Sequence, residues 1–252
     1  MNDENLDKVD FRYQAVTTLA EDFKSPYTGI VHKQGTIVCY SAITQYSKKT
    51  TITFPIPNVS AMYLDLSSKY FKDSHKELLK IENLENRIGE SVKIKDIPAF
   101  FDLLEKRIAS IILAYTALEV FANQTIPDNY IYYKERQDNK CKEIYSKEQI
   151  EHWIPLDEKL SDVLPKVLTI ESPKNKKSSN IWDKYKKLKK SRNRFIHLKS
   201  KDVKSSDIDK DPIWNILTAK NLEDPSIITK EIISFFIKGM KQKPRWFTKL
   251  PF

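Results

Sequence analysis

The stretch between Pro98 and Pro127 most constrains how this chain can fold. Its apolar residues recur every three to four positions, the spacing of one face of an α-helix. Pro98 suits the first turn of a helix, and the helix is expected to end before Pro127. The sequence therefore predicts a long helix at roughly 97–125. Its most apolar part, 108–122, is too short to span a membrane and contains Glu119.

The remainder of the chain after residue 60 also shows helical spacing. The chain has only four glycines, which disfavours Gly-rich phosphate loops and turn-dense all-β folds and suits a helical protein. The predicted fold class is mainly α. Further helices are expected at 61–84, at 157–168 with a break near Pro165, at 181–200 with Asn180 as its cap, and at 225–240. The Pro- and aromatic-rich tail 243–252 is expected to pack as an irregular arm.

The first 60 residues have a different composition. The segments 11–20, 35–43 and 50–57 are rich in Thr, Val, Ile and aromatic residues and are separated by turn signals, which predicts short antiparallel strands. Such a small piece buries little apolar surface by itself. We therefore expect two domains, an N-terminal β-containing extension at 1–62 whose role the sequence does not indicate, and a helical domain at 63–252.

The positive charge of the chain is concentrated in one segment. Residues 174–204 carry 13 Lys and Arg against two Asp, a net charge of +11, whereas the whole chain carries +9. Concentrated positive charge favours phosphate backbones or anionic membrane surfaces, and a solvated helix face explains it equally simply. The polar, acidic N-terminus contains no secretion signal, and the distant pair Cys39 and Cys141 indicates neither a disulfide framework nor a zinc site. We expect a cytoplasmic protein that does not enter the membrane.

The basic segment places an arginine on the apolar side of a helix. On a helix at 181–200, Arg192 falls in the middle of a stripe formed by Ile181, Tyr185, Leu188 and Phe195. A guanidinium that faces packed side chains is costly unless a carboxylate or phosphate meets it. Arg192 is therefore predicted to have a partner inside the fold or across an interface. Asn193 and His197, four residues apart, share another face of the same helix.

The long helix contributes a second polar feature. Thr116, Glu119 and Asn123 form a polar stripe on an otherwise apolar helix. Glu119 is a candidate buried partner for Arg192 or His197. A purely structural ion pair, or exposure of these side chains to solvent, explains the stripe as well.

At this point the sequence resembles a family. The residues R-N-R-F-I-H at 192–197 match the Arg-x4–6-His signature of HEPN domains, and TALEVFAN at 116–123 is similar to an earlier core helix of that family. The order of the intervening segments is also similar, so that the resemblance covers roughly 65–240. It implies a HEPN-like helical bundle, and residues 1–62 stand outside it as an addition.

The resemblance implies an RNA-cleaving enzyme. HEPN domains often act as metal-independent endoribonucleases, in which the motif helices of two copies meet as a homodimer. Arg192, Asn193 and His197 would then be the catalytic residues, with Glu119 and Asn123 supporting them. His197 suits proton transfer near neutral pH, Arg192 can hold two phosphate oxygens, and Asn193 can orient His197 or donate to phosphate. Flanking RNA backbone would contact Lys186, Lys189, Lys190 and Arg194.

No cofactor and no catalytic metal site is expected. The four histidines are scattered, and the acidic alternation at 207–211 lacks the Gly and the distal Glu of a calcium loop. Family members are often toxins or antiphage-defence effectors that cut tRNA, rRNA or mRNA and are restrained by an antitoxin, so a regulatory partner protein is also expected. Three alternatives stay open: a non-catalytic HEPN module that binds RNA or a protein, a purely structural helical protein, and a membrane-surface helix. The last is the weakest, because its apolar side would contain Arg192.

Overall fold

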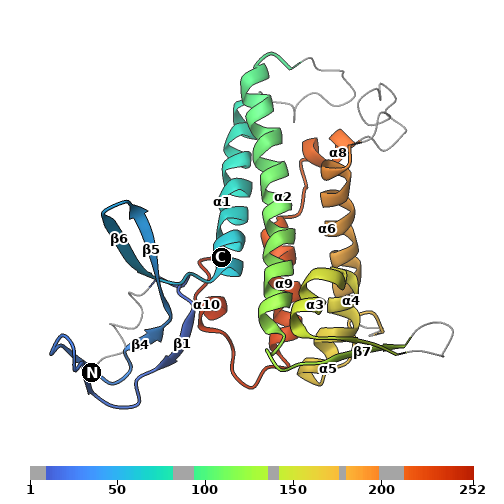
Figure 1. Ribbon diagram of the computed structural model, residues 1–252. Coiled ribbons are helices and arrows are strands. Elements are labelled where there is room, and N and C mark those ends of the chain that lie inside the picture. The colour runs from blue at the N-terminus through green and yellow to red at the C-terminus, as the bar shows by residue number, and fades with distance from the viewer. Residues whose placement is uncertain (1–9, 82–93, 136–141, 176–179, 199–212) are drawn as a thin grey trace. The chain divides into compact units, whose positions relative to one another are not determined.

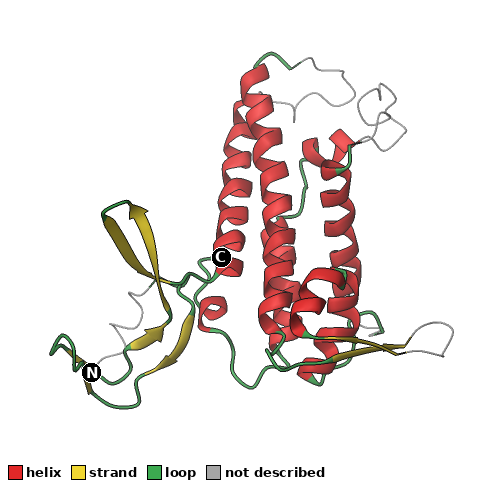
Figure 2. Cartoon of the chain, in the orientation of Figure 1, coloured by secondary structure: helices red, strands yellow, loops and turns green. Residues whose placement is uncertain are grey.

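The computed structural model describes residues 10–81, 94–135, 142–175, 180–198 and 213–252. Its contacts divide the chain into two compact units, Met1–Met62 with Gln242–Pro251, and Tyr63–Lys241 with Phe252. The described chain is mainly α-helical, as predicted, and its strands form small two-stranded sheets (Figure 2). The predicted domains, 1–62 and 63–252, differ from these units in residues 242–251. Among the described helices, none combines the length and apolar composition needed to cross a membrane.

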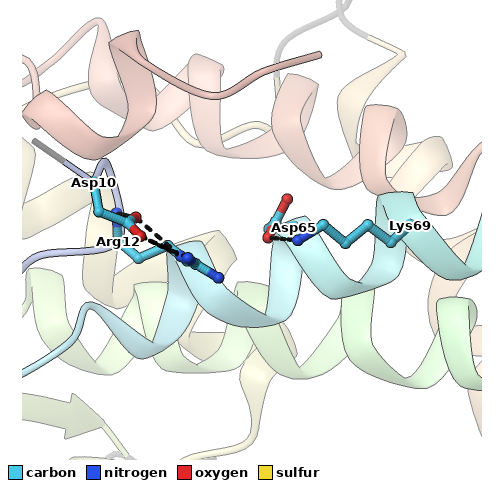
Figure 3. A network of polar contacts seen from close by, with 4 residues as sticks. All are labelled: Asp10, Arg12, Asp65 and Lys69. Atoms are coloured by element: carbon cyan, nitrogen blue, oxygen red, sulfur yellow. Dashed lines mark hydrogen bonds and ion pairs between the residues drawn. The ribbon is translucent and has the colours of Figure 1, made fainter. Parts of the chain in front are cut away.

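The described residues of the first unit form three antiparallel two-stranded sheets. Strand β1 (Ala15–Thr18) pairs with β4 (Ile37–Cys39), β2 (Phe23–Lys24) with β3 (Val31–His32), and β5 (Ser41–Ser47) with β6 (Thr50–Pro55). Strands lie within all three predicted segments, whereas the short β2–β3 pair was not predicted. Gly29 closes the turn between β2 and β3 with a φ of 68°, a conformation that glycine adopts without strain. Near the start of the first unit, Arg12 forms a bidentate ion pair with Asp10, in which the Arg12 Nε lies 2.9 Å from Asp10 Oδ1 (Figure 3).

The same unit contains a short helix in the C-terminal tail. Helix α10 (Arg245–Thr248) buries Trp246, whose indole ring lies edge-on to Phe247. The tail was expected to be irregular, and this expectation was wrong at these four residues. Pro244 precedes the helix and fixes the backbone angle at its start, which was the available sequence signal.

Two long helices form an antiparallel pair in the second unit (Figure 1). Helix α1 (Val59–Lys80) begins at Asn58, whose Oδ1 accepts a hydrogen bond from the Ala61 amide at 2.8 Å. Helix α2 (Ile97–Thr125) spans the predicted residues, because Asp96 accepts a hydrogen bond from the Ala99 amide at its start and the extended Ile126 ends it. The two helices approach closely where small side chains face each other. The hydroxyl groups of Ser67 and Ser110 each donate to the carbonyl of the other residue, at 2.8 and 2.9 Å.

Ion pairs form between residues of α1 and between α1 and α2. Asp65, which is almost fully buried, accepts from Lys69 one turn later at 2.6 Å (Figure 3). Glu77 is paired with Lys106 of α2 at 2.6 Å and with Lys80 at 2.8 Å. These lysines lower the pKa of the Glu77 carboxyl.

The core of the second unit lies where α2 contacts α6 (Ile181–Ile196) and α9 (Pro225–Ile237) and where α6 contacts α9. Helix α9 begins with Asp224, which accepts a hydrogen bond from the Ser226 amide, and with Pro225 in its first turn. Its predicted end at 240 was too late, because the helical conformation stops at Ile237. The fully buried side chains here come from all three helices and include Ile111, Leu118, Tyr185, Ile233 and Phe236.

The segment 147–168 is a run of short helices. Helix α3 (Lys147–Trp153) starts with a capping box of Ser146 and Gln149. Then α4 (Leu156–Glu158), the π-helical turn η3 (Lys159–Val163) and α5 (Leu164–Leu168) follow without interruption. The predicted break near Pro165 is therefore wrong. Proline has no N–H to bond the carbonyl four residues earlier, at Ser161, and the Ser172 hydroxyl donates to that oxygen at 2.6 Å instead.

A β-hairpin that the sequence did not predict lies beside these helices. Strands β7 (Tyr132–Glu135) and β8 (Lys142–Tyr145) pair antiparallel. The buried Tyr132 hydroxyl lies 2.5 Å from Asp162 Oδ2 and 2.9 Å from Glu158 Oε1, and Lys134 is paired with Glu158 at 2.7 Å. Burial raises the pKa of Tyr132, and both carboxylates raise it further. These polar contacts attach the hairpin to α4 and η3.

A buried arginine holds helix α8 (Ile213–Thr218) against α2. Arg107 is fully buried, and its Nη1 donates to the carbonyl oxygens of Leu217 and, at 3.0 Å, Ala219. Burial lowers the pKa of this guanidinium. Its Nε and Nη2 have no hydrogen-bond partner within the described chain. Arg107 therefore caps the C-terminal end of α8, where a cation is favourable.

Candidate functional site

The predicted motif lies in the C-terminal half of α6 and just beyond it. Tyr185 and Leu188 are the residues that α6 buries, so that the helix lies with one side on its neighbours. The Asn180 side chain was expected to cap this helix but makes no capping hydrogen bond, although its carbonyl accepts from the Lys184 amide. The predicted end at 200 was also wrong, because α6 stops at Ile196; residues 199 and 200 lie outside the described part of the chain.

Arg192 is half-buried and faces the packed side, as the helical spacing predicted. Its Cζ lies 5.0 Å from the ring centroid of Tyr115 on α2, and its Nη1 donates to Asn193 Oδ1 at 3.0 Å. A guanidinium over an aromatic face contributes about 0.5–2 kcal/mol, depending on how dry the site is. The partner of Arg192 within the described residues is thus the ring of Tyr115 and not the carboxylate that the sequence suggested.

Tyr115 belongs to an aromatic cluster between α2 and α6. Its ring stacks on Tyr185, with centroids 6.4 Å apart and an interplanar angle of 20°. Tyr185 also contacts Trp182, and the centroids of these two rings are 5.0 Å apart. The Tyr185 hydroxyl donates to Asp157 Oδ1 in α4. Burial raises the pKa of both tyrosines, and Asp157 raises that of Tyr185 further. Both hydroxyls are therefore protonated at neutral pH.

The predicted RNA-contacting residues have different surroundings. Lys189 is ion-paired with Asp157 Oδ2, the carboxylate that also holds Tyr185. Lys186 is exposed and paired with Asp183 at 2.8 Å, Lys190 is exposed, and Arg194 is half-buried. Part of the basic excess of α6 is thus compensated by carboxylates, which a count of charges along the sequence does not reveal.

Glu119 and Asn123 lie one and two turns beyond Tyr115 on α2 and are close to a buried lysine. Lys159 of η3 is 1% exposed, and its Nζ donates to Asn123 Oδ1 at 2.8 Å and to the Glu151 carbonyl at 2.9 Å. Burial lowers the pKa of Lys159, and the Glu119 carboxylate opposes this shift. Within the part of the chain that the structure describes, Glu119 forms no ion pair with Arg192 or His197. Its charge acts on Lys159 and Tyr115 instead.

His197 lies one residue beyond α6 at its C-cap. Its amide still donates to the Asn193 carbonyl at 3.0 Å, but its φ of −117° and ψ of 56° are not helical. The imidazole is exposed, and it has no hydrogen bond to Arg192 or Asn193 among the described residues. One chain therefore brings Arg192 and Asn193 together and leaves His197 open to another molecule.

Sequence reasoning missed several residues that build this site. Tyr115 lies four residues before Glu119, so helical spacing could have placed it on the same face. Tyr185 had been placed on the apolar stripe, but its hydroxyl needs a partner when buried, which was a usable signal. Asp157 and Lys159 gave none, because they reach the site only through the packing of α4 and η3 on α2 and α6. In the described ranges, no group of three or more His, Cys, Asp or Glu is placed to hold a metal ion, and 207–211 lies outside them.

The chain has no match among known proteins in three comparisons. No protein-family model matches it, and neither a search of curated proteins nor a search of solved structures finds a match.

Proposed function

We propose that this protein is a metal-independent endoribonuclease of the HEPN type that cleaves RNA with Arg192, Asn193 and His197. The observation that supports the proposal is the set of contacts made by the Arg192 guanidinium. Its guanidinium lies over the Tyr115 ring with only Nη1 bonded, to Asn193, and its other nitrogens make no hydrogen bond with described residues. A planar guanidinium held in this way presents donors to two phosphate oxygens.

The chemistry uses the 2′-hydroxyl of the RNA as the nucleophile. Its oxygen attacks the adjacent phosphorus while a base accepts its proton, and the P–O5′ bond breaks as an acid protonates the leaving oxygen. The products are a 2′,3′-cyclic phosphate and a free 5′-hydroxyl. His197 is the candidate acid or base, because histidine is the side chain that most often transfers protons in catalysis, and Arg192 stabilises the additional negative charge on the phosphate. Asn193 Oδ1 is engaged by Arg192, which leaves its amide protons to donate to the phosphate.

A homodimer would complete the site. Cleavage needs one group that accepts a proton and another that donates one, and each chain supplies a single histidine next to Arg192. The exposed position of His197 at the end of α6 leaves it accessible to a second copy. Mixing wild-type chains with an excess of His197→Ala chains under exchange conditions should lower the activity per wild-type chain if both chains contribute to one site. Light scattering that finds only monomers at assay concentration would contradict this arrangement.

The biological role that fits this chemistry is a toxin or antiphage-defence effector that cuts tRNA, rRNA or mRNA in the cytoplasm under the control of an antitoxin or another regulatory protein. The alternative is a module that binds RNA or a protein without cleaving. Lys189 is paired with Asp157 and Lys184 with Glu231, so both lysines pack α6, which favours a protein over RNA as the partner of such a module.

The first experiment is cleavage of total tRNA and of an mRNA by the wild type and His197→Ala, with EDTA present. His32→Ala is the matched control, because His32 is an exposed histidine on β3. We expect cleavage by the wild type and the control, at least a hundredfold faster than by His197→Ala. If neither protein cuts RNA but both bind it, the binding module is the correct function.

A further inference from the structure

Two neighbouring side chains, Tyr115 and Asn193, hold the Arg192 guanidinium. The guanidinium Cζ lies 5.0 Å from the centroid of the Tyr115 ring, and its Nη1 donates to Asn193 Oδ1. The remaining nitrogens, Nε and Nη2, make no hydrogen bond within the described chain. These two contacts hold the guanidinium while its remaining donors stay available to a ligand.

Tyr115 is itself held rigidly. It is nearly buried, and its ring stacks on Tyr185, which is 1% exposed. The Tyr185 hydroxyl is bonded to Asp157, and Lys189 binds the other oxygen of that carboxylate. Asp157 in α4 thus holds the Tyr185 ring of α6. Tyr185 in turn packs against the Tyr115 ring of α2, which contacts Arg192.

We propose that Tyr115 is a positioning residue that orders the Arg192 guanidinium for a backbone phosphate of RNA, and that Tyr185 and Asp157 hold Tyr115 in place. This proposal rests on the proposed ribonuclease function and identifies residues outside the Arg–Asn–His motif on which it depends. An arginine that is ordered before binding loses less side-chain freedom when it meets phosphate. Because the additional phosphate charge appears in the transition state, the loss of Tyr115 should lower kcat more than it raises KM.

The test is a double-mutant cycle on RNA cleavage. Tyr115→Leu removes the aromatic face, and Tyr115→Phe keeps it and removes only the hydroxyl. Tyr132→Leu is a control for the loss of another buried tyrosine, whose hydroxyl contacts Asp162 and Glu158 and not Arg192. We expect Tyr115→Leu to lower kcat at least tenfold, Tyr115→Phe to stay within twofold, and Tyr132→Leu to leave kcat of the folded fraction within threefold. Tyr115→Leu combined with Arg192→Ala should be no slower than Arg192→Ala alone. Additive losses in the double mutant would overturn the proposal.

A second measurement does not depend on activity. The chain has seven arginines, so arginine-selective ¹⁵N labelling gives few side-chain signals, and Arg192→Ala assigns the one of interest. Protons above an aromatic ring resonate upfield. We expect the Arg192 Nε–H signal to be shifted upfield in the wild type and in Tyr115→Phe, and to lose this shift in Tyr115→Leu. If no RNA is cleaved, the proposed ribonuclease function is wrong, but this chemical shift still tests whether Tyr115 positions Arg192. An unshifted wild-type signal would overturn this role of Tyr115.

Discussion

The most informative stability test is Tyr185→Phe, because it removes one oxygen atom from a ring that is 1% exposed. The ring, its stacking on Tyr115 and its contact with Trp182 remain, so no cavity forms. The main interaction lost is the hydrogen bond that the hydroxyl donates to the Asp157 carboxylate, and a weaker contact with the Tyr115 hydroxyl is lost with it. Hydrogen bonds to charged groups contribute about 1.5–3 kcal/mol, and water can replace the donor at this partly exposed carboxylate. We therefore expect a loss of about 1.5 kcal/mol in the free energy of unfolding at pH 7.

The same substitution has a pH signature. Burial and Asp157 raise the pKa of Tyr185 above its ordinary value of 10.0. Above pH 10 the unfolded chain loses the phenolic proton while the folded chain keeps it, so the folded state binds more protons. Its contribution to stability is complete below pH 10 and falls by about 1.4 kcal/mol per pH unit above it. Tyr185→Phe should remove this contribution to the alkaline slope and leave that of Tyr132, whose pKa is also raised.

The assay is urea unfolding followed by tryptophan fluorescence and circular dichroism between pH 7 and 11. Tyr133→Phe is the matched control, since Tyr133 is 58% exposed on β7 and should behave like the wild type. The reasoning is refuted if Tyr185→Phe has the wild-type alkaline slope, or if the control is destabilised as much as Tyr185→Phe at pH 7.

Three further predictions concern the packing of the helical unit. Gly239→Ala should lose about 1–3 kcal/mol in urea unfolding, because the added Cβ would lie 2.5 Å from Ile170 Cγ2; no loss would mean that this side chain can move aside. Thr169→Gly should raise the melting temperature by a few degrees, since Thr169 has a φ of 55° that a β-branched residue adopts only with strain of about 1 kcal/mol. Arg107→Met should change the free energy of unfolding by less than about 1 kcal/mol or increase it, because the substitution removes a buried charge that no carboxylate of the described residues compensates. Arg107→Ala, which also opens a cavity, should lose about 2–5 kcal/mol, and equal losses for both variants would contradict this account.

Local chemistry along the chain determined the long helices. Helix α2 has its predicted ends because Asp96, Pro98 and Pro127 act on the backbone beside them, whatever the rest of the protein does. The predicted strands are present for a similar reason, since residue type and turn signals act over a few positions. Helical spacing also determined that Arg192 faces the packed side of α6.

Tertiary structure decided what each of these residues contacts. Arg192 rests on Tyr115, Lys189 binds Asp157, and Asn123 holds Lys159, all through contacts between segments far apart in the sequence. A helical period gives the direction of a side chain but not which neighbour lies there, so the expected pairing of Glu119 with Arg192 could not be tested before the packing was known. The hairpin β7–β8 was missed for the same reason, because its stability depends on Tyr132 reaching two carboxylates in another segment.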